Sequence, residues 1–141
     1  MARVVSDASV VVKWFIEEKW SEQALKLRDM HVSGQVTVAA PELLFFEVLN
    51  ALRASRLFTE EELKMAANSL LNYRIERHQL SKPLAEKTVE VASRTRLTIY
   101  DAAYVALAVT LDTILYTADD EIVKKAGREY GRCVLHISKL Q

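Results

Sequence analysis

Two spacings of apolar residues alternate along the chain. Short runs rich in β-branched residues are typical of buried strands, and the segments between them place apolar residues three or four positions apart, as on one face of a helix. The short runs predict strands over residues 3–7, 36–40, 73–80, 113–117 and 133–137. The helical spacing predicts helices over residues 10–18, 21–31, 41–56, 59–72, 83–96 and 100–109, and one more that carries Ile122, Val123 and Ala126.

This alternation of strands and helices extends over the whole chain. It implies an α/β fold with a parallel sheet covered by helices on both faces. The length of 141 residues is usual for one domain and no linker interrupts it, so we expect a single domain over residues 1–141. Right-handed crossovers would then bring the carboxyl ends of the strands to one edge, where open α/β sheets bind their ligands.

Several residues predict local structure. Thr59 and Glu62 have the spacing of a capping box at a helix N-terminus. Pro41 suits the first turn of the helix over residues 41–56. Val89 falls on the expected apolar side of the helix over residues 83–96, and we expect Trp14 to pack in the core or at a dimer interface.

Composition narrows the functional classes. Lys and Arg together number 19, as do Asp and Glu, so the formal net charge is zero. This argues against duplex binding driven by overall charge, although a local basic groove remains compatible with it. The single cysteine, Cys133, lies in an apolar run, which favours a buried thiol in a reducing compartment. No apolar run is long enough to cross a bilayer, so we expect a cytoplasmic protein without a membrane partner.

Four acidic residues occupy notable positions. Asp7 and Asp119 follow predicted strands, Asp101 stands at the start of an apolar helix, and Glu47 is surrounded by large apolar side chains. Each has a local explanation, because Asp7 and Asp119 suit helix caps and Asp101 suits a capping box. Glu47 would need an ion pair, for example with Arg53 or Lys13, or else a solvated cleft or a metal.

The predicted topology places these four acids at one edge of the sheet. Four separate helix caps would not need to share an edge, so capping alone does not explain the arrangement. A cluster of carboxylates raises its own pKa values unless a cation compensates the charge. We therefore expect the four to meet within reach of one divalent cation, and carboxylates without His or Cys favour Mg²⁺ or Mn²⁺. His31, His78 and His136 lie in separate elements and are interpreted as structural or surface residues. Such a site suits phosphodiester hydrolysis by an activated water.

The arrangement of motifs resembles the PIN domain nucleases, in particular VapC-type ribonuclease toxins. The resemblance covers nearly the full length. It implies a five-stranded parallel sheet, Mg²⁺- or Mn²⁺-dependent endoribonuclease activity, a homodimer and a small antitoxin partner that occupies the active-site groove. The motifs that carry it are Val5-Ser6-Asp7-Ala8-Ser9, Pro41-Glu42-Leu43-Leu44 followed by Glu47-Val48, the run from Tyr100 to Ala108, and Thr117-Ala118-Asp119.

Position by position, the resemblance implies roles for seven residues. It identifies Asp7, Glu47, Asp101 and Asp119 as the acidic quartet that holds metal and orients water. The register selects Glu47 over Glu42 and Asp119 over Asp120. Supporting roles fall to the hydroxyls of Ser9 and Thr117 and to Asp120 as a helper.

RNA contacts and the overall function leave alternatives open. Five basic residues near Asp101 and Asp119 are candidates to flank an RNA groove, and a solvated surface is the competing interpretation. A catalytically silent PIN-like binding module is one alternative function, and a receiver domain with a phosphoacceptor aspartate is another. The basic candidates are Arg94, Arg96, Lys124, Lys125 and Arg128.

Overall fold

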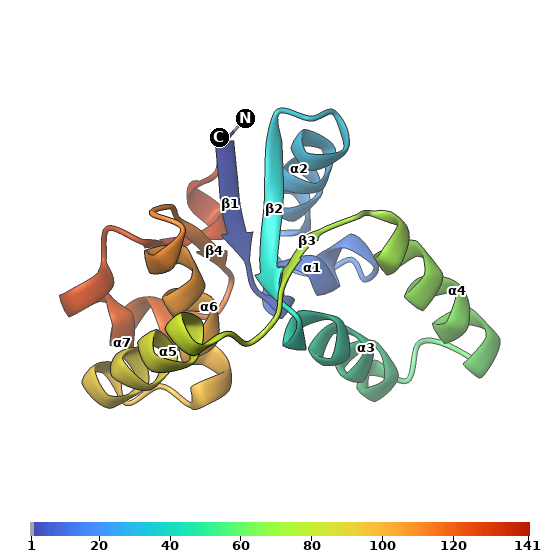
Figure 1. The fold of residues 1–141 in the computed structure, drawn as a ribbon. Coiled ribbons are helices and arrows are strands. Elements are labelled where there is room, and N and C mark those ends of the chain that lie inside the picture. The colour runs from blue at the N-terminus through green and yellow to red at the C-terminus, as the bar shows by residue number, and fades with distance from the viewer. Residues whose placement is uncertain (1) are drawn as a thin grey trace.

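Five parallel strands form one sheet in the computed structural model, which describes residues 2–141 (Figure 1). Their order is β3-β2-β1-β4-β5, so β1 lies in the centre and pairs with β2 and with β4. The expected five-stranded parallel sheet is confirmed. The strands are β1 (Ala2–Ser6), β2 (Val36–Pro41), β3 (Glu76–His78), β4 (Leu115–Thr117) and β5 (Val134–His136).

The helices form two groups, one on each side of the strands (Figure 1). The chain moves from β1 outward to β3 and then returns past β1 to β4, so right-handed crossovers place the later helices on the opposite face. One group contains α1 (Ala8–Val11), the 3₁₀ turn η1 (Val12–Trp14), α2 (Ser21–Val32), α3 (Leu43–Ser55) and α4 (Glu60–Asn72). The other contains α5 (Lys82–Thr95), α6 (Ile99–Thr110) and α7 (Asp120–Tyr130), and a short 3₁₀ turn, η2 (Ile137–Lys139), follows β5.

Three local expectations are corrected. The helix expected over residues 10–18 begins earlier, at Ala8, and ends as a 3₁₀ turn at Trp14. Pro41 ends β2 instead of opening α3; the next backbone N–H, that of Glu42, donates to the His78 carbonyl at 3.0 Å, so the missing proline N–H leaves the pairing intact. Val89 is 56% exposed, because it lies off the buried stripe of α5.

The expectations for Thr59 and Trp14 are confirmed. Thr59 and Glu62 form the capping box at the start of α4, with reciprocal hydrogen bonds of 3.1 and 2.9 Å. The Trp14 ring is buried in the core and its Nε1–H donates to the Ala24 carbonyl at 2.9 Å. The buried thiol expected at Cys133 is not confirmed, because this residue is only partly buried. In the described part of the chain, every helix is too short or too polar to span a lipid bilayer.

The core centres on α6, which packs against β1, β2, β4, α5 and α7. Its residues from Ala102 to Ala108 are all buried, as expected from the apolar sequence around this helix. The first turn of α6 is less buried and reaches the carboxyl edge of the sheet, the lower edge in Figure 1. Packing of the apolar body of α6 therefore fixes where Asp101 lies.

Truncating Leu107 of α6 tests this arrangement. Leu107 is 2% exposed, so Leu107→Ala should leave a cavity and lower the free energy of unfolding by about 2–5 kcal/mol. Urea unfolding followed by circular dichroism measures the change. Leu80→Ala deletes the same atoms from a side chain that is 75% exposed, and it should alter stability by less than about 0.5 kcal/mol. Equal effects of the two substitutions would contradict the assignment of α6 to the core.

Candidate active site

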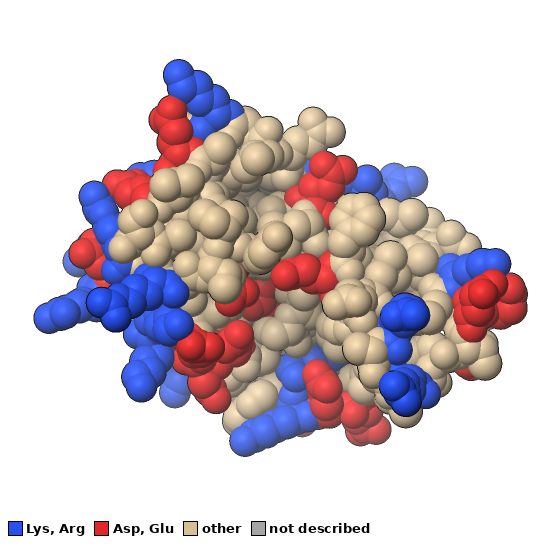
Figure 2. Space-filling view, turned by 90° about the horizontal axis from the view of Figure 1, so that it is seen from below, with Lys and Arg blue, Asp and Glu red and all other residues tan. Residues whose placement is uncertain are grey.

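A cavity of about 280 Å³ opens at the carboxyl edge of the sheet. It lies where the strand order reverses, between β1 and β4, which is the place where open α/β sheets form ligand crevices. Figure 2 looks onto this edge and shows acidic side chains grouped near its middle and basic ones mostly toward the margin. The lining residues are Asp7, Ala8, Ser9, Glu47, Asn50, Ala51, Asp101, Tyr104, Asp119 and Ile122. All four acids singled out in the sequence therefore line one cavity.

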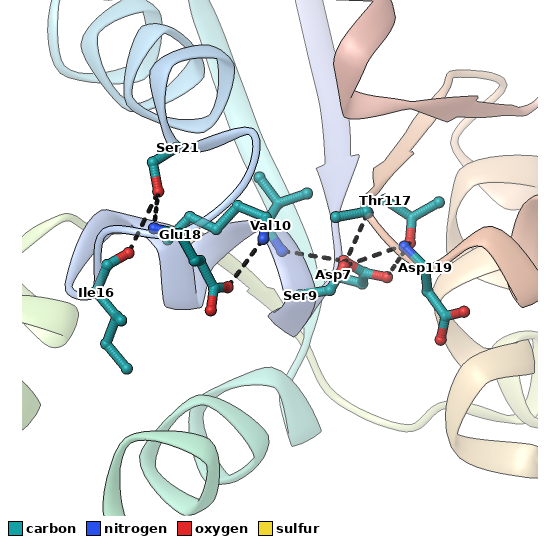
Figure 3. A network of polar contacts seen from close by, with 10 residues as sticks. Asp7, Ser9, Val10, Ile16, Glu18, Ser21, Thr117 and Asp119 are labelled. Atoms are coloured by element: carbon teal, nitrogen blue, oxygen red, sulfur yellow. Dashed lines mark hydrogen bonds and ion pairs between the residues drawn. The ribbon is translucent and has the colours of Figure 1, made fainter. Parts of the chain in front are cut away.

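Asp7 is the most constrained of the four. It directly follows β1, is 3% exposed, and caps α1, its Oδ1 accepting from the Val10 N–H at 3.4 Å. The Ser9 hydroxyl donates to Oδ1 at 2.6 Å, and the Thr117 hydroxyl donates to Oδ2 (Figure 3). Capping and a place in the cavity are thus compatible roles of one carboxylate. The supporting positions expected for Ser9 and Thr117 correspond to direct hydrogen bonds.

These hydroxyls also tie β1 to the segment after β4. Ser9 Oγ accepts from the Ala118 N–H at 2.9 Å, and Thr117 Oγ1 accepts from the Asp119 N–H at 3.0 Å. Figure 3 shows the resulting network, which sets the position of Asp119 relative to Asp7. Two segments more than 100 residues apart are therefore aligned by side chains that also hold the central carboxylate.

Burial raises the pKa of the Asp7 carboxyl from 3.8 to about 6. The hydrogen bonds from Ser9, Thr117 and Val10 oppose this rise, and repulsion from Asp119 adds to it. A carboxylate that is expensive to ionise when the cavity is empty would be stabilised by a cation beside it. The electrostatics of the site thus favour a positively charged ligand.

Glu47 lies on α3 and is held by a phenol. The Tyr104 hydroxyl of α6 donates to Glu47 Oε1. The ion pair of Glu47 with Arg53 or Lys13, one of the alternatives left open by the sequence, is not formed. Lys13 binds Glu18 at 2.8 Å instead, and no described basic side chain pairs with Glu47. Burial raises the pKa of Glu47, the Tyr104 hydrogen bond opposes the rise, and Asp101 adds repulsion. Burial and the carboxylates also hold the Tyr104 pKa well above its usual range.

Asp101 and Asp119 complete the cavity from the starts of two helices. Thr98 Oγ1 caps α6 by accepting from the Asp101 N–H at 3.1 Å. Unlike the capping box at Thr59, this cap lacks the return hydrogen bond from the Thr98 N–H to the acidic side chain. Asp119 caps α7, its Oδ1 accepting from the Glu121 N–H at 2.9 Å. Burial, followed by repulsion from Asp119 and Glu121, raises the Asp101 pKa. A hydrogen bond from the Thr98 side chain opposes this rise in the Asp101 pKa, and Asp101 lines the cavity.

Sequence reasoning missed two polar lining residues, Asn50 and Tyr104. Asn50 lies three residues after Glu47 on α3, and Tyr104 lies three residues after Asp101 on α6. Residues three apart share a helix face. This spacing was the available signal, although it does not say which of several neighbours reaches the cavity.

Other candidates lie outside the cavity. The Asp120 side chain is 97% exposed and faces His136 Nε2 at 3.4 Å, so the structure does not place it as a helper of Asp119. Glu42 is exposed and is not a lining residue, which agrees with the choice of Glu47.

The five basic candidates are exposed, and two of them have acidic partners. Arg94 pairs with Glu90 at 2.9 Å, and Lys125 pairs with Glu121 at 2.8 Å. Arg96, Lys124 and Arg128 form no ion pair with the other described residues, and none of the five lines the cavity. A flanking role in RNA binding remains a prediction for them.

The histidines have structural contacts, as expected. His31 Nδ1 accepts from the Val38 N–H at 3.0 Å and its Nε2 faces the Tyr73 carbonyl at 2.6 Å, joining α2 to β2 and the end of α4. His78 binds Glu76 at 2.7 Å. His136 Nδ1 accepts from the Ser138 N–H at 3.1 Å.

The expectation that the four acids meet within reach of one divalent cation is not confirmed. Within residues 2–141, no three His, Cys, Asp or Glu side chains converge closely enough to form a ready-made metal site. The four carboxylates line one cavity without closing around one point. This donor set still fits Mg²⁺ or Mn²⁺, because Mg²⁺ usually keeps several waters and binds one or two carboxylates together with substrate phosphates. The lining supplies only oxygen ligands of that kind and no thiol or imidazole.

Comparisons with known proteins agree on one family. A family model described as PIN domain matches residues 4–128. Ribonuclease VapC3 from Pyrobaculum aerophilum is 30% identical over 128 residues, which cover 87% of this chain and 94% of that protein. Ribonuclease VapC1 from Mycobacterium tuberculosis is 43% identical over 91 residues, 62% of this chain and 67% of that protein. A toxin-antitoxin complex from Klebsiella pneumoniae has the same fold, with a TM-score of 0.65 at 18% identity over 95% of this chain and 97% of that one.

The pKa of Asp7 predicts how stability depends on pH. The folded-state pKa of about 6 exceeds the ordinary 3.8, so ionising Asp7 destabilises the metal-free protein as the pH rises through this interval, by an order of 2–3 kcal/mol. Asp7→Asn removes that cost and retains a helix cap. Because the amide replaces one acceptor oxygen, the net gain near pH 7.5 should be roughly 1–2 kcal/mol, and near pH 4 it should vanish or reverse.

Urea unfolding of both proteins with a chelator, near pH 4 and near pH 7.5, measures this difference. Asp112→Asn is the matched control, because Asp112 is exposed in a turn outside the cavity. A lower stability of Asp7→Asn near pH 7.5 would contradict the assigned cost of the buried charge.

Proposed function

The chain belongs to the PIN domain family, and we propose that it is a divalent-metal-dependent endoribonuclease that hydrolyses single-stranded or looped RNA, as the toxin of a toxin–antitoxin pair. The observation that carries the proposal is the cavity at the β1–β4 switch point. Four carboxylates from separate segments line it, and no basic residue of the described chain does. The names of the two VapC relatives, both ribonucleases, support the reaction class.

Asp7, Glu47, Asp101 and Asp119 would hold Mg²⁺ or Mn²⁺ in this cavity. When bound, such an ion lowers the pKa of a coordinated water and offsets the charge of the scissile phosphate. The protein's own groups prepare the site. Ser9 and Thr117 keep the Asp7 carboxylate in one orientation, and Tyr104 does the same for Glu47. Fixed carboxylates require little rearrangement when the phosphodiester binds, which is a general source of catalytic advantage.

The alternative functions are less well supported. A receiver domain would have the strand order 2-1-3-4-5, whereas this sheet has the order 3-2-1-4-5. In addition, Asp7 is followed by Ala8 and not by a second acid. A catalytically silent binding module would not need the costly burial of Asp7 beside Asp119, which a metal site explains.

A small antitoxin protein is the partner we propose. The solved toxin-antitoxin complex from Klebsiella pneumoniae, which shares the fold, supports this choice. The homodimer implied by the family resemblance stays a prediction, and sedimentation of the purified chain would measure it.

Asp101→Asn tests the proposed activity. The substitution retains the backbone cap of α6 but removes a charged metal ligand, so RNA cleavage with Mn²⁺ should fall by more than about 100-fold, beyond the effect typical of residues that only support a ligand. Cleavage of a mixed RNA pool in Mn²⁺, Mg²⁺ or chelator provides the measurement, and Asp112→Asn is again the control. Cleavage by the Asp101 variant in the presence of chelator would reject the mechanism.

Tyr104→Phe tests the support of Glu47. The ring stays in its buried place while the hydroxyl that binds Glu47 is lost. We expect a 10- to 100-fold loss in Mn²⁺ affinity or activity, the range typical of groups that orient a ligand. Isothermal titration with Mn²⁺ in the absence of RNA separates the two effects, and unchanged affinity together with unchanged activity would show that the hydrogen bond is dispensable.

A further inference from the structure

A second groove, of about 370 Å³, adjoins the acidic cavity. Both hollows are lined by Ala8, Ser9 and Ala51, so they share a wall at the start of α1 and on α3. The charged residues that line this groove are Lys13 and Glu18. A molecule bound over the carboxylates can therefore extend directly into a groove that contains a cation.

Lys13 is buried in an unusual way for a lysine. Its side chain is 9% exposed, and its Nζ makes one hydrogen bond, of 2.8 Å, to Glu18 Oε1. An ammonium group has three donors, and the other two find no acceptor among the described residues. Buried lysine is costly unless its charge and donors are satisfied. The single carboxylate partner, 43% exposed, leaves this ammonium with capacity for a further anion.

The local structure holds the pair in the groove. Ser9 lies on α1 and Lys13 on the 3₁₀ turn η1 that follows it, and both residues line the groove. Ser21 fixes the other member, because its Oγ accepts from the Glu18 N–H at 2.8 Å (Figure 3).

We propose that this groove is a phosphate-binding subsite for the RNA strand, in which Lys13 binds a phosphate next to the scissile one and Glu18 holds the ammonium until RNA displaces it. The proposal rests on the proposed function. It supplies what the cavity lacks, since the carboxylates there repel a polyanion and the lining contains no basic side chain among the described residues. The geometry of the four acids is unaffected, because Lys13 pairs with Glu18 and with none of them.

The matched variants are Lys13→Met, Glu18→Gln and Lys64→Met. Lys64 is an exposed lysine of α4 that also has an acidic partner, Glu60, and it lines neither hollow. Binding of a short fluorescein-labelled single-stranded RNA is measured by anisotropy with chelator present. Lys13→Met should weaken binding about tenfold, as expected for loss of one charge-assisted contact, and should reduce the slope of log K against log salt by about 0.7.

Glu18→Gln should act in the opposite direction and tighten binding, because it removes a competing carboxylate from the phosphate position. Lys64→Met should bind RNA like the unmodified protein. If the Lys13–Glu18 pair is purely structural, both substitutions should lower the melting temperature, and their effects on RNA affinity should not have opposite signs. Equal effects of the two substitutions on affinity would overturn the subsite.

A series of RNAs, each with one phosphate replaced by neutral methylphosphonate, locates the contact. Methylphosphonate at one position should weaken binding of the unmodified protein about tenfold and leave binding of Lys13→Met unchanged. The reason is that the RNA change and the protein change remove the two partners of the same contact. Additive losses at every position would overturn the proposal. If the protein cleaves RNA with Mn²⁺ but no phosphate position shows this dependence on Lys13, the subsite alone is rejected. If one position shows it but the protein does not cleave RNA, the nuclease activity alone is rejected.

Discussion

Burial of the Asp7 carboxylate at the end of β1 is the constraint on which the rest of the site depends. The side chain is 3% exposed and lies beside Asp119, so its ionised form needs compensation. Within the protein this comes from two hydroxyls and one backbone N–H instead of a basic residue. Hydrogen bonds of this kind orient a carboxylate while leaving its charge available to a cation, which suits a metal ligand better than an ion pair would.

The same hydrogen bonds connect folding with function. Ser9 and Thr117 each contact Asp7 and a backbone N–H of the segment after β4, so they join the two strands that flank the switch point. The Tyr104 phenol joins α3 to α6 in a similar way through Glu47. The packing that buries the body of α6 and the polar contacts at its start therefore act on the same geometry. A loss of core packing and a loss of site geometry are consequently difficult to separate in this fold.

Charge is distributed unevenly although the net charge is zero. The cavity is acidic, several basic side chains near α5 and α7 are paired with glutamates, and Lys13 is held in the adjoining groove. A polyanionic strand would therefore meet attraction at a few fixed points and repulsion elsewhere. Such a pattern favours binding in one register over general electrostatic attachment.

The sequence by itself determined the alternation of strands and helices, the capping box at Thr59, and the choice of the four acids expected at the carboxyl edge of the sheet. These features follow from local spacing and from the ends of strands. Only the tertiary structure decided the partners. It gave Glu47 the phenol of Tyr104 instead of Lys13, turned Asp120 toward His136, and ended β2 at Pro41. Partners are decided by the packing of elements distant in sequence, and several side chains with equal local claims compete for each contact. Propensity and spacing rank residues within one element, whereas contacts between elements depend on the whole fold.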